Sequence, residues 1–504
     1  MSQSRKPRTP KPPARKAVAA AKAPAARRPA GRGGAGSTAA VPGVVRLPEQ
    51  SHGVPHAERR AAGKALRERV ARDVLANWQP DARRADPVDL LLASSAGRVP
   101  ELLPIRHGRM MASPFAFFRG AAAVMAHDLS TATTTGLNVV ACGDCHLMNF
   151  GGFASPERRL VFDINDFDEV SVAPWEWDVA RLAASFVIAG RANGFRAADC
   201  REAAWTAARS YRENMARYAE MPVLDAYYEA IDLEKLVLAG TDEEMKRLNL
   251  KRIRKAQSES AHLKEYTRLT VESGGQPRIR DEPPLIFHDT DLERQAGYRA
   301  MVEGMIAQYV ATLPPERRLL LERYRLADVA VKVVGVGSVG TYCGIALMVS
   351  GNGDPLFLQF KEARASVLEP YCGRLPFAHA GERVVFGQRL LQAGADIFLG
   401  WMTGGFTGKH FYVRQLRDAK IKPMVEIMKP VNLRAYASAC GWALARAHKR
   451  TGDAVMLTGY LGASNAFEDA MTAFAARYAD RNEQDHAALV AAVRAGRVEA
   501  RAEA

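Results

Sequence analysis

The stretch that most constrains the fold of this chain lies between residues 139 and 186. An apolar run is followed by Asp144 and, five positions later, by Asn149. A second apolar run, Leu160–Phe162, is followed by Asp166. Oxygen side chains at the ends of neighbouring strands can converge on one point, and such a set suits Mg²⁺, which keeps phosphate oxygens among its ligands. Phosphoryl transfer needs little beyond such positioning and charge neutralisation.

Three motifs follow one another here: Asp144-x-His146-x-x-Asn149, then Asp166-Phe167-Asp168, then a helix beginning WDVARL at Trp177. In this order they resemble the catalytic segment of the aminoglycoside-phosphotransferase branch of the protein-kinase-like superfamily. The wider set includes SPFAFFRG upstream and FLQFKEARASVLEPY downstream. With it, the chain resembles the bacterial DUF2252 family from about Gly63 onward, which implies a fold and a chemistry class but no substrate.

The resemblance implies a catalytic pair, Asp144 and His146, and a set of metal ligands, Asn149, Asp166 and Asp168. Asp178 would be the buried helix carboxylate that braces the catalytic loop. Asp166 is preferred to Asp163 because it lies twelve residues before Asp178, close to the family spacing. Cys142 departs from the branch, which usually has histidine before Gly-Asp.

A competing motif overlaps the catalytic loop. Residues 142–146 read C-x-x-C-H, a string used for haem attachment, redox chemistry or zinc binding. Haem attachment requires export, and the N-terminus shows no apolar signal segment. No second C-x-x-C completes a tetrahedral zinc site. Small residues packed under a loop are therefore the favoured interpretation.

A glycine-rich segment lies about two hundred residues further on. A strand, Val329–Val334, is followed by G-V-G-S-V-G at 335–340 and a second strand, Tyr342–Val349. A third, Leu356–Lys361, ends in lysine. The Rossmann glycine motif opens a helix, whereas here another strand follows. The kinase arrangement instead places backbone N–H groups and a strand lysine over the phosphates, which assigns nucleotide binding to Gly335, Gly337, Ser338, Gly340 and Lys361.

The helix expected at Ala380–Ala395 would supply a partner for that lysine. Glu382 is the only acid in its first half and is the nominee. Four alternatives remain: Glu362, Glu369, Gln388 and Gln392.

The order of these parts is unusual, because the glycine loop and lysine precede the catalytic loop in ordinary kinases. We therefore expect an α+β, circularly permuted protein-kinase-like fold. Its mostly helical large lobe, residues 46–315, would precede a small antiparallel-sheet lobe, residues 316–428. Helices of residues 429–504 would complete the large lobe. Permutation is tolerated where chain termini lie close at the surface.

The net charge of +15 is concentrated at the N-terminus. Ten of these charges lie in the first 45 residues, which contain no acid and are rich in Ala, Pro and Gly. We expect a disordered tail, which could contact nucleic acid loosely or simply be solvated. The six scattered cysteines suit a reducing compartment. With no apolar run of membrane-spanning length, a cytoplasmic protein is expected.

The segment before the catalytic stretch combines three arginines with three phenylalanines. Arg106, Arg109 and Arg119 either face a phosphate or substrate or snorkel from a buried helix entry. Both interpretations remain open.

Together these features predict an ATP- and Mg²⁺-dependent phosphotransferase that acts on the hydroxyl group of a small molecule. Two alternatives remain: transfer of a nucleotidyl (AMP) group by the same site, and nucleotide binding without turnover.

Overall fold

The computed structural model describes residues 43–48, 51, 53–257, 266–283, 285–289, 293–294, 296–333, 339–405, 407–416 and 419–501. The basic tail expected at residues 1–45 lies almost wholly outside this part of the chain, as do Gly335, Gly337 and Ser338. Residues from Gly43 onward form one compact unit.

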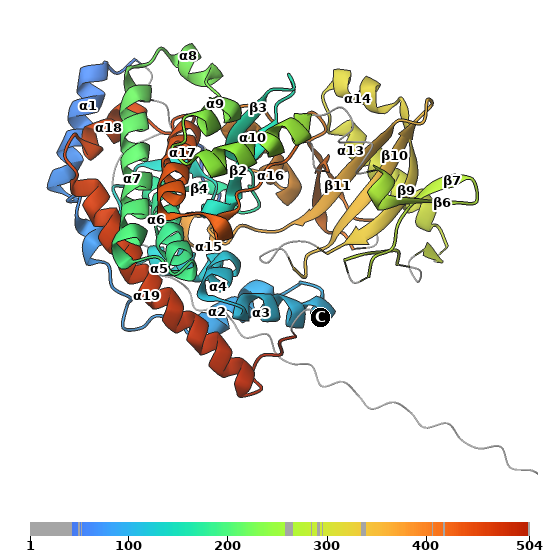
Figure 1. The fold of residues 1–504 in the computed structure, drawn as a ribbon, viewed down its shortest axis with the longest axis horizontal. Coiled ribbons are helices and arrows are strands. Elements are labelled where there is room, and N and C mark those ends of the chain that lie inside the picture. Colours follow the sequence, from blue (N-terminus) through green and yellow to red (C-terminus); the bar gives the residue numbers. More distant parts are fainter. Residues whose placement is uncertain are drawn as a thin grey trace, which may run out of the picture. The chain divides into compact units, whose positions relative to one another are not determined.

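The chain is mixed α+β, as expected, and its largest sheet has six antiparallel strands in the order β12-β13-β11-β10-β9-β8 (Figure 1). The strands are β8 (Ile286–Phe287), β9 (Tyr324–Lys332), β10 (Cys343–Ser350), β11 (Pro355–Ala363), β12 (Gly400–Thr403) and β13 (His410–Gln415). Lys361 on β11 lies opposite Cys343 on one side and Tyr412 on the other. The lysine therefore sits within the sheet, where its backbone is fixed by two neighbouring strands.

Helices α13 (Tyr298–Ala311) and α14 (Pro315–Leu321) pack on this sheet. The fully buried Tyr309 donates a hydrogen bond from its hydroxyl to the Phe398 carbonyl oxygen (2.6 Å). Because β8 and α13 both belong to this layer, the sheet region begins before the boundary at residue 315 that the sequence suggested.

Two short sheets carry the catalytic stretch. One pairs β1 (Asn138–Ala141) with β4 (Ser171–Pro174), and the other contains β2 (Phe150–Ala154), β3 (Leu160–Ile164) and β5 (Ile231–Asp232). The strands β1, β3 and β4 are almost completely buried. Their apolar side chains and those of the central helices form one hydrophobic core.

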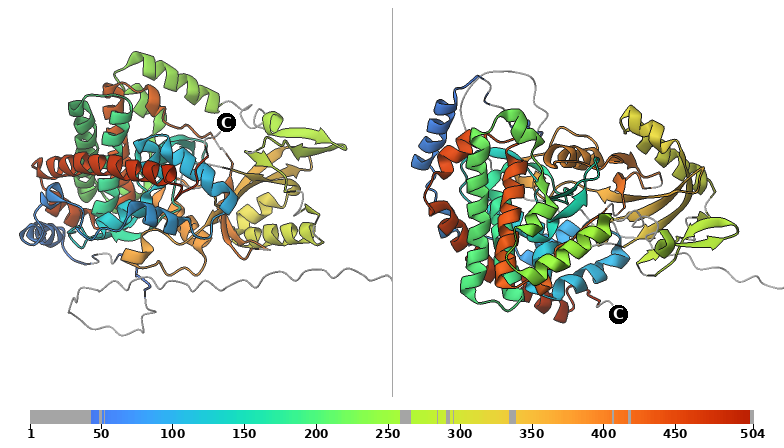
Figure 2. Two further views of the ribbon diagram at one scale, coloured as in Figure 1. Left: turned by 90° about the horizontal axis from the view of Figure 1, so that it is seen from below. Right: turned by 45° about the horizontal axis from the view of Figure 1, so that its top comes forward.

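The central helices come from both ends of the chain. They are α6 (Trp175–Ala192), α7 (Ala197–Glu220), α17 (Pro430–His448), α18 (Ala454–Leu461) and α19 (Ala466–Arg494). The red C-terminal helices lie beside the green α6 and α7 in both figures (Figures 1 and 2). At Gly441 an added Cβ would meet the Ala207 carbonyl oxygen at 2.3 Å, so α17 approaches α7 too closely for any side chain there.

The remaining helices cover these layers or lie at their edges: α1 (His56–Ala65), α2 (Pro87–Ser95), α3 (Leu103–Met111), α4 (Pro114–Gly120), α5 (Ala122–Leu129), α8 (Val223–Tyr228), α9 (Leu233–Leu238), α10 (Glu243–Gln257), α15 (Glu369–Cys372) and α16 (Ala380–Leu391). A separate hairpin joins β6 (Thr270–Ser273) to β7 (Gln276–Ile279). None of the helices described is long and apolar enough to cross a membrane.

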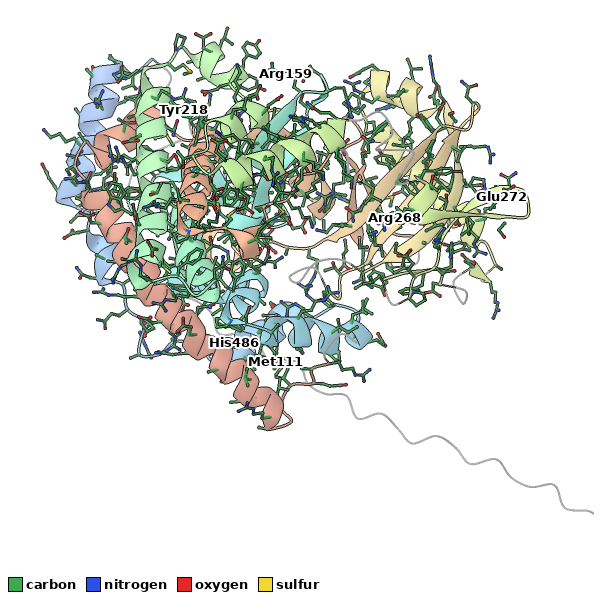
Figure 3. All side chains as sticks on the ribbon, viewed as in Figure 1. Met111, Arg159, Tyr218, Arg268, Glu272 and His486 are labelled. Atoms are coloured by element: carbon green, nitrogen blue, oxygen red, sulfur yellow. The ribbon has the colours of Figure 1, made fainter. Side chains whose placement is uncertain are left out.

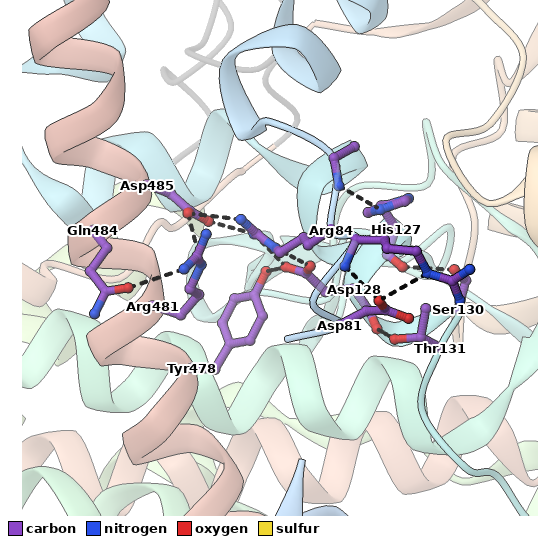
Figure 4. A network of polar contacts seen from close by, with 12 residues as sticks. Asp81, Arg84, His127, Asp128, Ser130, Thr131, Tyr478, Arg481, Gln484 and Asp485 are labelled. Carbon is purple, nitrogen blue, oxygen red and sulfur yellow. Dashed lines mark hydrogen bonds and ion pairs between the residues drawn. The ribbon is translucent and has the colours of Figure 1, made fainter. Parts of the chain in front are cut away.

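Helix α19 is attached to the N-terminal helices by buried polar contacts. Arg84 binds Asp128 on α5 and Asp485 on α19, and the Tyr478 hydroxyl also donates to Asp128 (2.9 Å) (Figure 4). Further along α19, a ring nitrogen of His486 lies 2.9 Å from the carbonyl oxygen of Met111 (Figure 3). These contacts join segments about 350–400 positions apart in the sequence.

The buried carboxyl group of Glu176 on α6 predicts a pH-dependent stability. Burial raises its pKa to about 7, against the hydrogen bonds that it accepts from the backbone and hydroxyl of Thr135. The folded state thus holds a proton that the unfolded chain releases above about pH 4. Its stabilising contribution is complete below that pH and is lost as the pH rises through 7.

We expect the free energy of unfolding of the wild type to fall by about 1–3 kcal/mol more than that of Glu176→Gln between about pH 5 and pH 8. Urea unfolding at both pH values measures this difference. Parallel pH profiles for the two proteins would contradict the assignment.

Candidate functional site

The loop that carries Asp144 is held by a buried carboxylate on α6. The Asp178 carboxylate accepts hydrogen bonds from the backbone N–H groups of Cys142 (2.8 Å) and Gly143 (3.0 Å). Gly143 has a φ of 83°, and a Cβ there would meet the Glu169 carbonyl oxygen at 2.2 Å. Only glycine fits this turn. Asp178 therefore braces the loop, as expected.

The brace is itself supported by the C-terminal part of the chain. A ring nitrogen of His448 at the end of α17 lies 3.2 Å from the Asp178 carboxylate. The other ring nitrogen lies 2.9 Å from the hydroxyl of Tyr211 on α7. All three side chains are buried, so residues after 430 help to fix a loop near residue 143.

Asp144 faces Arg181, one turn after Asp178 on α6. The Nε and Nη2 atoms of Arg181 lie 2.6 and 2.5 Å from Oδ1 of Asp144. The second carboxylate oxygen, Oδ2, lies 3.8 Å from Nε2 of His146. Burial raises the pKa of Asp144, although the nearby arginine opposes the shift. With one oxygen held and the other left to accept a proton, the group meets the geometric requirement for a general base.

His146 and Asn149 complete this loop. Burial lowers the pKa of His146 well below its ordinary value, and its Nδ1 accepts a hydrogen bond from the backbone N–H of Met148 (3.2 Å). A neutral imidazole is expected at neutral pH. The Asn149 amide nitrogen donates to the Asp144 carbonyl oxygen (2.8 Å), which leaves its Oδ1 as an oxygen donor for a metal.

The two acids after β3 face Lys361. The lysine ammonium lies 2.6 Å from Oδ2 of Asp168, and Oδ1 of Asp168 is buried without a hydrogen-bond partner. Asp166 accepts a hydrogen bond from the backbone N–H of Asp168 (3.2 Å). Burial and the neighbouring Asp168 charge raise the pKa of Asp166. Burial disfavours the charged form of Asp168 too, but the ammonium of Lys361 holds its pKa below the ordinary value.

Asp163 has a different role from its two neighbours. Both its carboxylate oxygens contact Arg446 on α17, at 2.8 and 2.6 Å. They also accept hydrogen bonds from the backbone N–H groups of Ile164 and Ala393. With these partners Asp163 is a structural residue, which agrees with the preference for Asp166 as a metal ligand.

Two cavities meet at this site. The lysine cavity, of about 370 Å³, is lined by Lys332, Lys361, Arg414 and Lys420, among others. The arginine cavity, of about 420 Å³, contains Arg98, Arg106, Arg364, Asp144 and His146 in its wall. Arg119, Asn149 and Asp166 line both cavities. The proposed metal ligands therefore lie where two chambers of small-molecule size join.

The structure separates the expected nucleotide-binding residues. Lys361 and Asp166 line one cavity, but Lys361 has its ion pair with Asp168, and Glu382 does not line the lysine cavity. From α16 it is Gln388 and Gln392 that do so. Glu382 lies near the start of α16, whereas the helix faces the cavity from its second half. Gly340, with a φ of 85°, binds the backbone of Val99 through its carbonyl oxygen.

Cys142 and Cys145 lie under the catalytic loop, within 4.8 Å of an oxygen of Asp178. Both thiols are buried, and burial raises the pKa of each. The Asp178 oxygens already accept backbone hydrogen bonds, and protonated thiols are poor metal ligands. The contacts agree with the packing interpretation of the C-x-x-C-H string.

Sequence reasoning assigned no role to several cavity residues: Arg98, Lys332, Arg364, Arg414 and Lys420. Arg414 follows a strand that was expected, so its alternation on β13 was a usable signal. Arg98 and Arg364 come from loops about 270 positions apart, and no local pattern links them. Their proximity depends on the tertiary fold alone.

No curated protein matches the chain, and neither does any solved structure. A family model described as "Uncharacterized protein conserved in bacteria (DUF2252)" matches residues 98–492. This match includes the catalytic loop, both acids after β3, Lys361 and the helix that supplies Arg446 and His448. Since it extends over well more than half of the 504 residues, the chain belongs to the DUF2252 family.

Proposed function

We propose that this protein is an ATP- and Mg²⁺-dependent phosphotransferase that acts on a hydroxyl group of a small molecule, with a circularly permuted protein-kinase-like fold. The observation that carries the proposal is the meeting of Lys361 with Asp166 and Asp168. A strand lysine and metal-binding acids about two hundred residues apart line one cavity. Kinase chemistry requires this pairing.

The permuted order is supported by the packing of the C-terminal helix α17. It supplies Arg446 to Asp163 and His448 to Asp178, so it supports the catalytic segment from a position after the sheet. In the resemblance on which the proposal rests, this helix directly precedes the catalytic loop. A permutation moves it to the end of the chain while keeping its packing.

The side chains fit a magnesium ion. The carboxylate of Asp166, the amide oxygen of Asn149 and the orphaned Oδ1 of Asp168 are hard oxygen donors beside both cavities. When bound, Mg²⁺ would neutralise phosphate charge. Lys361 would then exchange its contact with Asp168 for the phosphates.

The chain's own groups divide the remaining work. Lys361, Arg414 and Lys332 give the lysine cavity the positive charge that a triphosphate requires. Asp144, in the wall of the other cavity, would orient an acceptor hydroxyl and accept its proton. Rate enhancement would come chiefly from placed charges around the transferred group.

ATP labelled at either its α- or its γ-phosphate tests the reaction class. The proposal predicts transfer of the γ-label and release of ADP in the presence of a bacterial metabolite extract as the source of acceptor. Transfer of the α-label would identify a nucleotidyltransferase instead. Tight binding of Mg-ATP without transfer of either label would indicate a nucleotide-binding protein that lacks turnover.

Replacement of Lys361 by methionine is expected to weaken ATP binding by about 10-fold or more, since a charge-assisted contact to phosphate contributes about 1.5–3 kcal/mol. Isothermal titration of the full chain with ATP and Mg²⁺ measures the change. Lys449→Met, at the end of α17, is the matched control. Equal affinities for wild type and Lys361→Met would exclude the lysine from the nucleotide site.

A further inference from the structure

The arginine cavity carries more positive charge than its acids balance. Its acidic residues are largely matched by cations: Asp144 by Arg181, Asp168 by Lys361, and Glu362 by Lys409 at 2.9 Å. Asp166 faces the metal position already described. The arginines in the wall are therefore not needed to neutralise these acids.

Three of those arginines have only neutral acceptors in the described part of the chain. Arg106 donates to the Ser95 hydroxyl (3.0 Å) and to the Gly120 carbonyl oxygen (2.9 Å). Arg364 donates to backbone carbonyl oxygens of residues 94 and 96. Arg119 has no hydrogen-bond acceptor among the residues described, and its guanidinium lies 5.9 Å from the Phe115 ring centroid.

These guanidinium groups are also deeply placed. Arg106 is 1 % exposed, and the Nε atoms of both Arg106 and Arg119 are buried without a hydrogen-bond partner. A buried charge without a counter-ion is costly. A fold that keeps three of them around one cavity of about 420 Å³ is suited to an anionic ligand.

We infer that the phosphoryl acceptor is itself an anion: a hydroxyl compound with a phosphate or carboxylate group that Arg106, Arg119 and Arg364 bind. This inference rests on the proposed function and gives its acceptor a chemical class. The anionic group would lie toward the arginines and the hydroxyl toward Asp144. Guanidinium groups bind both phosphate and carboxylate in a bidentate manner. A cationic acceptor such as an aminoglycoside would meet like charges here.

Binding of inorganic phosphate to the full chain, preloaded with Mg²⁺ and a non-hydrolysable ATP analogue, tests the inference by isothermal titration. Acetate tests the carboxylate source, and kanamycin tests the cationic alternative. We expect phosphate or acetate to bind at millimolar concentration or below, and kanamycin not to bind. Binding of kanamycin, or of none of the three probes, would overturn the inference.

Two variants locate the bound anion. Arg119→Gln and Arg364→Gln are each expected to weaken anion binding by about 10-fold, whereas Arg201→Gln, an exposed residue of α7, should leave it unchanged. Arg364 supports two loop carbonyls, so circular dichroism must show that its variant folds; Arg119 has no such role. Unchanged anion affinity in the folded variants would refute the assignment.

The nucleotide arm separates this inference from the proposed function. Mg-ATP binding with no anion binding would overturn the acceptor class alone. Anion binding that depends on Arg364, in a protein that does not bind Mg-ATP, would support the anion site and overturn the phosphotransferase.

Discussion

Asp166→Asn is expected to remove the Mg²⁺-dependent part of nucleotide binding and to lower any phosphoryl transfer by at least about 10²–10³-fold. The carboxylate lies where both cavities join, and no neighbouring group can replace its charge, because Asp163 is occupied by Arg446 and backbone donors. Ligand at about 100 times its dissociation constant stabilises a protein by about 2.7 kcal/mol.

Thermal unfolding with ATP, with and without Mg²⁺, measures this effect. The wild type should gain a shift that requires both components, and Asp166→Asn should not. Asp354→Asn, in the exposed turn between β10 and β11, is the matched control. A magnesium-dependent shift that persists in Asp166→Asn would exclude this residue as a metal ligand.

The second large effect concerns stability. Arg446→Met is expected to lower the free energy of unfolding by about 3–5 kcal/mol, since it leaves the Asp163 carboxylate buried without its counter-ion. Both side chains of this pair are 0 % exposed, and Arg446 also donates to the Leu391 carbonyl oxygen. The pair joins α17 to the end of β3.

Chemical denaturation measures the change in Arg446→Met. The control on the same helix is Arg434→Met, whose ion pair with Glu202 is at the surface and should contribute less than about 1 kcal/mol. The double variant Asp163→Leu/Arg446→Met should recover part of the loss, because it removes both charges. Similar losses for Arg446→Met and Arg434→Met would contradict the buried-pair argument.

The sequence predicts local features well where period and punctuation are strong. The strands around 329–334, 342–349, 356–361 and 411–416 and the helix from Ala380 are confirmed, since runs of β-branched residues and turn glycines mark them. Strand β8 has two residues and β12 has four, which is too short for an alternating pattern. Both are formed by pairing with longer neighbours.

Candidate site residues were predictable where they share one motif. Asp144, Asn149 and Asp166 lie within 23 positions of the sequence and do line neighbouring cavities. The pairing of Lys361 with Asp168 was not predicted, because it depends on how far α16 approaches β11. The arginine cavity draws on loops and helices before the catalytic stretch and after β11, so its charge balance appears only in the folded chain.

The most direct test of the account is a crystal structure of the full chain with Mg²⁺ and a non-hydrolysable ATP analogue. The account predicts the triphosphate in the lysine cavity, with Lys361 on a phosphate and the metal bound by Asp166 and Asn149. A nucleotide bound elsewhere, such as the apolar cavity between α9, α10 and α17, would contradict a single site built from both halves of the chain.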